Sequence, residues 1–494
     1  MSDAAAPREE IDWTAPATGA FSRSFRFGEW IAEPVTPLFE SWLLTAMEDG
    51  LHDTLRRWIG QRAPRPRHVV VNGWYFYSIN WLSPGALARS LPGIIRNLVR
   101  NPRRVAGVIP PTVRFSVPLF EHEWRTDVLP RYLAEVARAE EQVEVLDAPA
   151  LVPLVDHLAT LAGEYFASIA ALAGAGYKLE MNLAAFHRRH LAGQLDGGHL
   201  PLLAGFEVPR ALPPYAVTSL DWFQATMDVP ETTQAAARRA VRHGHQVGAR
   251  EMAEASTRHV LAASPRRLAE FERLLGDAQH LVPLREAQVR ELTLPWPVMR
   301  RAVMRIGEEL TRSGALLAAE DVFFLRRSEA IAGLASEPVP SPAEVRDRRL
   351  TWARQGRLVP PLIVGRVNPM LRRVWDSFPR LVGAIRSDRA VVSGSPASAG
   401  RVTAVVRVIR GPAEFGELEP GEVLVAPVTA PAWTPLFGLA SAVVTDVGSA
   451  AAHASVVARE YGIPAVVGCG DATTRLHTGM RVTVDGSTGN VELA

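Results

Sequence analysis

Residues 443–468, VVTDVGSAAAHASVVAREYGIPAVVG, place two short apolar runs on either side of an Ala-rich stretch. The runs have the β-branched texture of buried strands, and Gly448 with Ser449 is a turn signal after the first of them. The stretch between them predicts a helix over 452–461, with His453 in its first turn. A strand, a turn, a helix and a second strand in this order are typical of a compact α/β domain.

His453 lies where a nucleophilic side chain and a phosphate-binding helix end would meet. The first turn of a helix presents free backbone N–H groups and a partial positive charge, so it favours a bound phosphate. Imidazole is largely neutral and nucleophilic near pH 7. Thr445 and Arg459 could add hydrogen-bond donors. His453 is therefore a candidate phosphoryl carrier, and the alternative interpretation is a histidine that only caps or packs the helix.

An ordered series of segments carries a family resemblance. The segments are TAPAWTPLF at 429–437, VVTDVG at 443–448, HASVVAREYGIPAVVG at 453–468, GMRVTVDGSTGNVEL at 479–493, and the opening GSPASAGRVTAVVRVI at 394–409. Together they resemble the swivelling histidine domain of the phosphoenolpyruvate-utilising enzymes, a family that includes phosphoenolpyruvate synthase, pyruvate phosphate dikinase and the rifampicin phosphotransferases. The resemblance implies that His453 is phosphorylated and that the phosphate is bound by Thr445, Gly448, Ser449 and Arg459.

Two positions depart from that family pattern. Ser449 stands where the family usually has a second glycine, and Ala452 stands where it usually has Ser or Thr. A hydroxyl just before the histidine could bind the phosphate, and Ala452 lacks one.

The resemblance continues upstream. EWIAEPVTPL at 29–38, Asn72-Gly73 with the tyrosines that follow, and residues 305–325 resemble the substrate-binding domain of rifampicin phosphotransferase-like proteins. This resemblance implies an acceptor pocket in the helical region, and the expected substrate-binding residues are Glu29, Arg290, Trp296, Arg300 and Arg305. Trp296 follows Pro295 where those relatives carry lysine, which indicates a different acceptor chemistry.

The distribution of apolar, Gly and Pro residues along the chain predicts a multi-domain protein of the α and α/β classes. We expect a disordered leader over 1–20, a mostly helical substrate-binding domain over 21–335, a Pro- and Arg-rich connector over 336–389, and the swivelling phosphohistidine domain over 390–494. A chain of 494 residues is long enough for two or three cores.

Three local patterns predict individual elements. A turn at Asn72-Gly73 inside the β-branched and aromatic run 68–77 predicts a hairpin. The amphipathic period over 296–313 predicts a helix that ends at Gly314. The apolar stretch 151–179 is interrupted by polar side chains and reads as a buried helical hairpin rather than a membrane span.

Composition excludes several partners and sites. The formal net charge of +2 gives no basis for a nucleic-acid or membrane partner. Cys469 is the sole cysteine, so a disulfide or thiolate cluster within the chain is excluded, and with no signal peptide a cytoplasmic location is expected. His187, His190 and His199 with Asp196 lack the i, i+4 spacing of a helical zinc site, so no metal is expected.

The function predicted from these features is a phosphotransferase that works through a phosphohistidine. No ATP-grasp pattern precedes residue 21, and Lys178 is the only lysine. We therefore expect ATP and Mg²⁺ on a separate ATP-grasp-type subunit, no cofactor on this chain, and a small apolar acceptor. Two alternatives stay open: phosphorylation that drives an elimination or condensation, and a non-catalytic binding protein that kept the fold.

Overall fold

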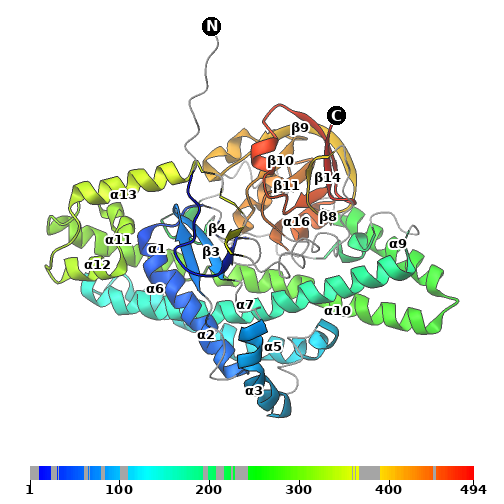
Figure 1. Cartoon of the computed structure of the whole chain (residues 1–494), viewed down its shortest axis with the longest axis horizontal. Helices are drawn as coiled ribbons and strands as arrows, with labels where there is room; N and C mark the ends of the chain where they lie inside the picture. The colour runs from blue at the N-terminus through cyan, green and yellow to red at the C-terminus, as the bar shows by residue number, and fades with distance from the viewer. Residues whose placement is uncertain are drawn as a thin grey trace, which may run out of the picture.

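The computed structural model describes residues 11–23, 31, 33–59, 65, 67–78, 84–100, 110–192, 198–206, 216–217, 219–223, 226–227, 243–358, 360–361, 363–366, 390–448 and 452–494. A mostly helical region is followed by an α/β region that stands above helices α7 and α10 (Figure 1). The predicted fold class is confirmed.

The helical domain is built around α7 (Ala148–His190), which packs against α2 (Thr45–Ile59), α10 (Pro265–Leu292) and α11 (Trp296–Arg312). The hairpin expected over 151–179 is wrong, because α7 is one continuous helix of 43 residues. The polar residues that seemed to interrupt it have partners on other elements: Asp156 binds Arg327 and the Trp42 indole N–H, and Glu164 binds Arg131. By length and composition α7 could cross a membrane, but 76% of its most apolar window is buried inside the protein.

Two glycines let α2 approach α7 closely. A Cβ on Gly163 would lie 2.5 Å from the Ala46 carbonyl oxygen, and a Cβ on Gly50 would lie 2.5 Å from the Gly163 carbonyl carbon. No side chain fits at either position, so the two backbones pack directly against each other.

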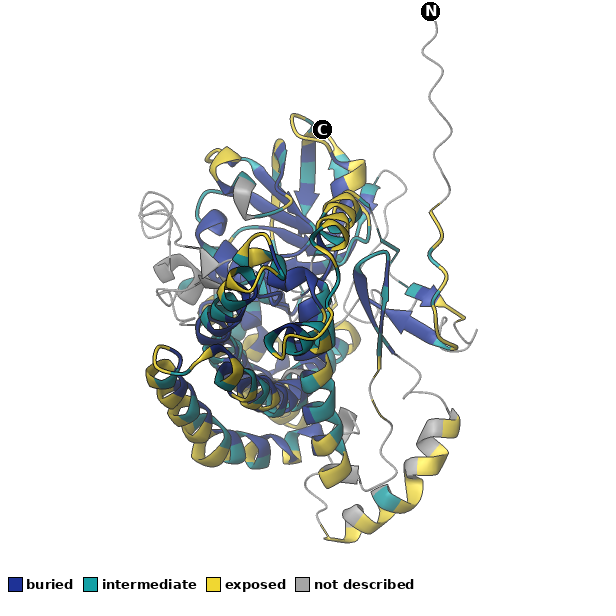
Figure 2. Cartoon of the chain, turned by 90° about the vertical axis from the view of Figure 1, so that its left-hand side faces the viewer, coloured by how far each residue is buried: buried dark blue, intermediate teal, exposed yellow. Residues whose placement is uncertain are grey.

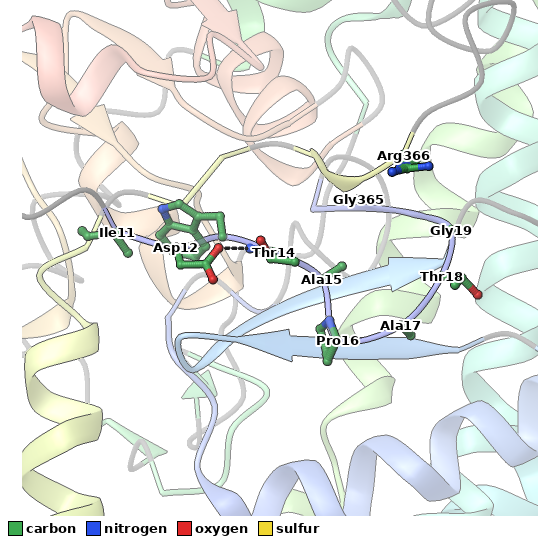
Figure 3. Close-up of a pocket in the computed structure, with 11 residues that line it drawn as sticks. Ile11, Asp12, Thr14, Ala15, Pro16, Ala17, Thr18, Gly19, Gly365 and Arg366 are labelled. Atoms are coloured by element: carbon green, nitrogen blue, oxygen red, sulfur yellow. Dashed lines mark hydrogen bonds between the residues drawn. The ribbon is translucent and has the colours of Figure 1, made fainter.

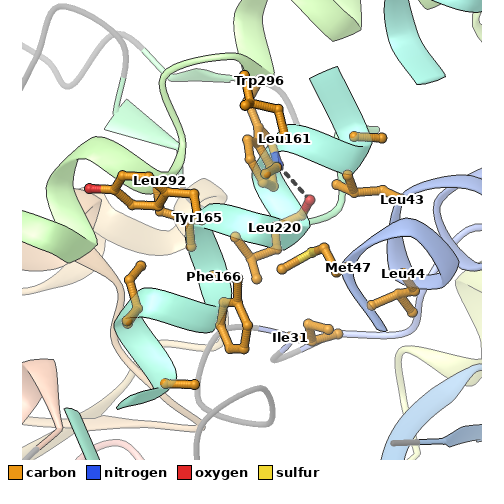
Figure 4. Close-up of a cluster of buried hydrophobic side chains, with 14 of the residues drawn as sticks. Ile31, Leu43, Leu44, Met47, Leu161, Tyr165, Phe166, Leu220, Leu292 and Trp296 are labelled. Atoms are coloured by element: carbon orange, nitrogen blue, oxygen red, sulfur yellow. Dashed lines mark hydrogen bonds between the residues drawn. The ribbon is translucent and has the colours of Figure 1, made fainter. Parts of the chain in front are cut away.

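The main core lies between these helices and the segment around Leu220 (Figure 4). Trp296 begins α11 and donates its indole N–H to the Leu220 carbonyl oxygen at 2.7 Å. The predicted end of this helix is confirmed, since α11 stops at Arg312 and Gly314 has φ +79°.

The other α-helices of the domain are α1 (Pro37–Phe39), α3 (Pro84–Arg100), α5 (Val117–Glu123), α6 (Leu129–Gln142), α9 (His243–Leu261), α12 (Arg327–Leu334) and α13 (Pro342–Gln355). Shorter turns are the 3-10 helices η4 (Pro110–Phe115), η6 (Leu200–Leu203) and η7 (Ala319–Phe324), and the π-helices η2 (Glu40–Leu44) and η5 (Trp124–Val128).

A small antiparallel sheet in the order β2-β3-β1-β6 flanks the helices. Its strands are β1 (Ala20–Ser22), β2 (His68–Val71), β3 (Trp74–Ser78) and β6 (Ile363–Gly365), and a two-stranded ribbon joins β4 (Ala216–Val217) to β5 (Thr226–Met227). The predicted hairpin is confirmed as β2–β3, with positive φ at Asn72 and Gly73.

The expected leader is partly folded. Residues 1–10 lie outside the described residues, but Trp13 packs edge-on against Phe76, with ring centroids 6.3 Å apart. Ala20 is buried and begins β1. Apolar side chains that find a sheet face to cover account for this order.

The range expected to be a connector also differs in part. Within 336–389, helix α13 begins with a capping box in which Ser341 and Glu344 bond each other's backbone N–H groups. The indole of Trp352 packs edge-on against Phe223 and Phe324. This part of the range therefore belongs to the helical domain, as does β6, and residues 367–389 lie outside the described residues.

The C-terminal domain is an eight-stranded sheet in the order β7-β14-β13-β9-β10-β11-β12-β8. The strands are β7 (Ala390–Ser393), β8 (Ser395–Ser398), β9 (Arg401–Val408), β10 (Val423–Ala426), β11 (Ala442–Thr445), β12 (Ala465–Val467), β13 (Arg481–Asp485) and β14 (Asn490–Leu493); the helices are α15 (Thr434–Phe437), α16 (His453–Tyr461) and α17 (Ala472–Arg475), with 3-10 turns η8 (Pro412–Glu417) and η9 (Pro431–Trp433). Neighbours from β9 to β12 run parallel, and β10, β11 and β12 are buried at every position (Figure 2). Buried parallel strands explain their near-continuous apolar sequences.

Candidate functional site

His453 is the first residue of α16, as the sequence predicts. The preceding residue, Ala452, is extended and gives the first turn no side-chain cap. The first-turn N–H groups therefore have no competing hydroxyl at this position, and an anion could take its place.

The turn before His453 depends on Gly448. Its φ is +149°, and a Cβ there would lie 3.2 Å from the Val467 Cβ and 3.3 Å from the Thr445 hydroxyl. Thr445 is fully buried at the end of β11, and its hydroxyl has no hydrogen-bond partner among the described residues. Ser449 lies outside the described residues. Because this buried hydroxyl is unpaired and lies beside the turn, Thr445 remains a candidate hydrogen-bond donor to a bound phosphate.

The ring of His453 is held from both sides. Its Nδ1 lies 3.3 Å from Glu286 Oε2, and its Nε2 lies 3.3 Å from the Thr434 hydroxyl. Glu286 belongs to α10, so the first contact crosses from the C-terminal domain to the helical domain. The side chains of His453 and Glu286 are 7% and 6% exposed. The two domains therefore meet at the histidine itself.

Glu286 keeps its negative charge in this position. Burial alone would raise the pKa of its carboxyl, but the His453 hydrogen bond and the neighbouring Arg285 charge outweigh that effect and hold the pKa below its usual value. Arg285 is itself buried, with its Nη2 3.1 Å from Glu286 Oε1. An ionised carboxylate at Nδ1 makes that nitrogen the N–H donor and leaves Nε2 with its lone pair.

Arg459 lies on the same helix and forms a second interdomain contact. Its Nε donates to the Ala397 carbonyl oxygen at 2.6 Å, and its Nη2 donates to Glu180 Oε1 of α7 at 2.9 Å. Burial would raise the pKa of Glu180, but Arg459 and His199 hold it below its usual value. In this docked arrangement Arg459 thus binds a carboxylate, and phosphate binding by Arg459 stays a prediction.

A third contact involves the neighbouring Glu460. Its Oε1 accepts a hydrogen bond from the backbone N–H of Phe206 at 2.9 Å. Burial raises the pKa of this carboxyl to about 7. His453, Arg459 and Glu460 together dock α16 on the helical domain.

The residues expected to bind the acceptor have partners within the helical domain. Arg290 donates to Glu291 at 2.7 Å, Trp296 is buried, and Arg300 lies 5.2 Å over the Phe323 ring. Arg305 donates to the Val143 carbonyl oxygen, and Glu29 lies outside the described residues. Their binding roles stay predictions.

The structure instead brings Arg285 and Glu286 to the histidine, and sequence reasoning missed both. The Arg-Glu dipeptide occurs twice on α10, at 285–286 and at 290–291. Only the first pair contacts His453 in the described residues, because its side chains lie on the helix face that α16 covers. The repeated dipeptide was the only signal in the sequence, and it does not say which copy is used.

Two cavities are large enough for a small molecule. One of about 810 Å³ lies between residues 11–19 and Gly365-Arg366, where Thr14 donates its backbone N–H to Asp12 (Figure 3). The other, of about 590 Å³, lies between the two domains and is lined by Trp74, Trp352 and Asp446 among others. Across the described ranges, no three His, Cys, Asp or Glu side chains converge as metal ligands.

The chain is similar to known phosphotransferases. Residues 418–489 match the family model described as PEP-utilising enzyme, mobile domain. An uncharacterized phosphotransferase, YvkC, of Bacillus subtilis is 37% identical over 193 residues, 38% of this chain and 23% of that protein. The rifampicin phosphotransferase of Streptomyces sviceus is 32% identical over 262 residues, 52% of this chain and 29% of that protein.

A third relative is the prodigiosin synthesizing transferase PigC of Serratia marcescens. It is 44% identical over 126 residues, 25% of this chain and 14% of that protein. The matched regions thus span less than a third of the length of these curated relatives.

Proposed function

We propose that this member of the PEP-utilising enzyme family carries a phosphoryl group on His453 and delivers it to a small-molecule acceptor bound by the helical domain. The observation that carries the proposal is the 3.3 Å contact between His453 Nδ1 and Glu286 Oε2, made with both side chains nearly buried. A carboxylate that holds Nδ1–H leaves Nε2 as the ring nitrogen that carries the phosphoryl group when the domains are docked. The phosphotransferases among the relatives support the same class of reaction.

The bond changes follow from that tautomer. His453 Nε2 bonds to the donor's phosphorus, and the bond from phosphorus to the donor's leaving oxygen breaks. The ring then carries a positive charge, which ionised Glu286 offsets across the Nδ1–H hydrogen bond once the C-terminal domain has docked again. In the second step an acceptor oxygen bonds to the phosphorus, the P–Nε2 bond breaks, and neutral imidazole takes up the acceptor's proton at Nε2.

The phosphoryl oxygens need donors near Nε2. Thr434 already lies 3.3 Å from that nitrogen, and the buried Thr445 hydroxyl faces the Gly448 turn. With the first-turn N–H groups of α16, these hydroxyls would bind the phosphoryl oxygens. Arg459 would join them after it leaves Glu180.

We further propose that the donor, ATP with Mg²⁺, is held by a separate ATP-grasp-type subunit in the cytoplasm, and that this chain binds no cofactor of its own. The burial of the His453 side chain, 7% exposed, supports a second position of the C-terminal domain, because a donor site needs access to Nε2. Loading and delivery would then take place in different arrangements of the two domains.

A second candidate is a condensation driven by phosphorylation, whose product lacks the phosphoryl group. The similarity to a relative named as a prodigiosin synthesizing transferase favours it. Both candidates use phospho-His453, so the product's mass separates them: a phosphotransferase product retains the phosphoryl group.

The test is phosphorylation of the full chain by a host-cell extract supplied with labelled ATP and Mg²⁺. We expect an acid-labile, alkali-stable label on His453 that is absent from His453→Ala. Glu286→Gln should still take up the label, because loading takes place with His453 away from Glu286. It should lose the label to acceptors in the extract about 10- to 100-fold more slowly, because the docked ring is no longer held at Nδ1. Glu291→Gln, five residues further along α10, is the matched control and should take up and lose the label at the normal rates. Label on another residue would refute the proposal.

A further inference from the structure

The cavity between the two domains has the position of a ligand site. Its volume of about 590 Å³ suits a small molecule. Part of its lining, including Val428 and Val447, directly follows the parallel strands β10 and β11. Ligands of open α/β sheets bind at this carboxyl edge. The opposite wall comes from the helical domain, with Trp74 and Trp352.

Arg23 gives the cavity a buried cation. The residue is 5% exposed, and its guanidinium lies 4.4 Å over the Trp74 ring centroid. Stacking on an indole uses the face of the guanidinium and leaves its N–H edge for hydrogen bonds. The Arg23 Nε is nevertheless buried without a hydrogen-bond acceptor among the described residues.

The carboxylate of Asp446 does not fill this need. Asp446 attracts Arg23 through space, but burial still lowers the pKa of Arg23 to about 9. The two Asp446 oxygens accept hydrogen bonds from the Thr473 backbone N–H, at 2.9 Å, and from the Thr473 hydroxyl. A buried arginine with an unpaired N–H is costly unless an oxyanion binds to it.

The remaining walls are partly apolar, with Glu33, Arg357, Arg410, Glu414 and Thr473 at other points of the lining. Besides the two indoles they include Pro34, Leu358 and Pro427. The indole N–H groups of Trp74 and Trp352 donate to the carbonyl oxygens of Gln355 and Pro34, so both rings are held as walls. An oxyanion at Arg23 would thus be attached to an apolar and preferably planar body.

We propose that the interdomain cavity binds a small aromatic carboxylate, with the carboxylate on the N–H edge of Arg23 and the ring against the two tryptophans. The walls come from both domains, so the ligand stabilises their docked arrangement. The site does not depend on phosphoryl transfer, and it can be tested without a phosphoryl donor.

Calorimetry on the full chain with benzoate tests the site. We expect binding that Arg23→Gln weakens at least about tenfold. Arg125→Gln is the matched control, because Arg125 also stacks on a tryptophan, Trp124, but does not line the cavity. Benzamide, with the same ring and no charge, should bind at least about tenfold more weakly than benzoate to the unaltered protein. Equal benzoate affinity in the two arginine variants would overturn the proposal.

A measurement on the unaltered protein covers the case in which Arg23→Gln does not fold. Benzoate should slow hydrogen exchange both at the end of α13 and at the segment after β11, which face each other across the cavity. Protection on one side only would refute an interdomain site. Inorganic phosphate that binds as tightly as benzoate would refute the aromatic specificity. Loss of His453 labelling in the earlier experiment would leave these results unaffected.

Discussion

Arg459 Nη2 of α16 lies 2.9 Å from Glu180 Oε1 of α7, and the two side chains are 3% and 8% exposed. The pair joins residues 279 positions apart, one in each domain. In a fixed core, removing one partner of a buried ion pair costs about 3–5 kcal/mol. An undocked domain lets both ions regain water, so this pair stabilises docking more than folding.

Glu180→Gln should therefore favour the undocked arrangement and leave both domains folded. The expected result is faster hydrogen exchange in α16 and an almost unchanged unfolding temperature. Glu164→Gln is the matched control: Glu164 lies on the same helix but binds Arg131 of the helical domain. Equal exchange in the two variants would contradict the docking role of the Arg459 pair.

Docking should weaken as pH rises, because burial raises the pKa of Glu460 from 4.5 to about 7. Below pH 4.5 the carboxyl is protonated in both arrangements. Between pH 4.5 and about 7 only the docked form keeps the proton. The free energy that favours docking therefore falls progressively over this range, by at most about 3 kcal/mol. Above that range the loss is complete.

Small-angle scattering between pH 5 and pH 8 measures this effect, with about pH 7 as the upper end of the transition. In Glu460→Gln the side chain is neutral at every pH. The radius of gyration of this variant should therefore stay at the value of the docked form across the whole pH range. Glu308→Gln, an exposed position on α11, should leave the profile as it is. A wild-type profile that shows tighter docking at high pH would contradict the prediction.

Gly163→Ala should destabilise the helical domain. The new Cβ would lie 2.5 Å from the Ala46 carbonyl oxygen, so α2 must move, and overpacking of this kind costs about 1–3 kcal/mol. Gly276→Ala on α10 is the control, because a Cβ there meets nothing within 4 Å and alanine favours a helix. Denaturant unfolding should show a lower free energy of unfolding for Gly163→Ala and a higher one for Gly276→Ala than for the unaltered protein.

Gly448→Ala should impair His453 phosphorylation beyond its effect on stability. At φ +149° an alanine is strained, and the turn that leads into α16 must shift. Gly421→Ala carries comparable backbone strain at φ +90°, with open space around it. Both should lose about 1–2 kcal/mol of stability. Only Gly448→Ala should lose labelling, and equal loss in both would assign the effect to strain alone.

ATP should not label the purified chain directly. If the donor site lies on a separate subunit, calorimetry with ATP and Mg²⁺ should detect no binding, and His453 should stay unlabelled until host extract is added. Tight nucleotide binding by the isolated chain would contradict the proposal that ATP is held by a separate subunit.

Elements that depend on near neighbours could be predicted from the sequence. The hairpin at Asn72-Gly73, the helix that begins at Trp296 and the helix that begins at His453 each follow from a turn residue and a local period. The capping box of Ser341 and Glu344 was equally local, and it could have revealed α13 inside the range expected to be a connector.

Features that depend on distant partners could not be predicted. Asp156 breaks the apolar pattern of α7 in the sequence, but Arg327 satisfies it from 171 positions away. Glu286 resembles any other helix carboxylate until His453 is placed 3.3 Å from it. Arg459 has the position expected of a phosphate ligand in the sequence, and only the packing of α16 on α7 pairs it with Glu180. A period along one helix carries no information about which other helix covers it.

The pairing of β1 with β6 has a topological consequence. Ala20 lies opposite Gly365, so the chain enters and leaves the helical domain at one edge of a single sheet. A domain whose two ends meet can be transplanted as a cassette, since inserting it between neighbouring positions of a host protein barely separates them. Joining the ends by a short loop and opening the chain elsewhere should likewise give a circular permutant that folds around the same core.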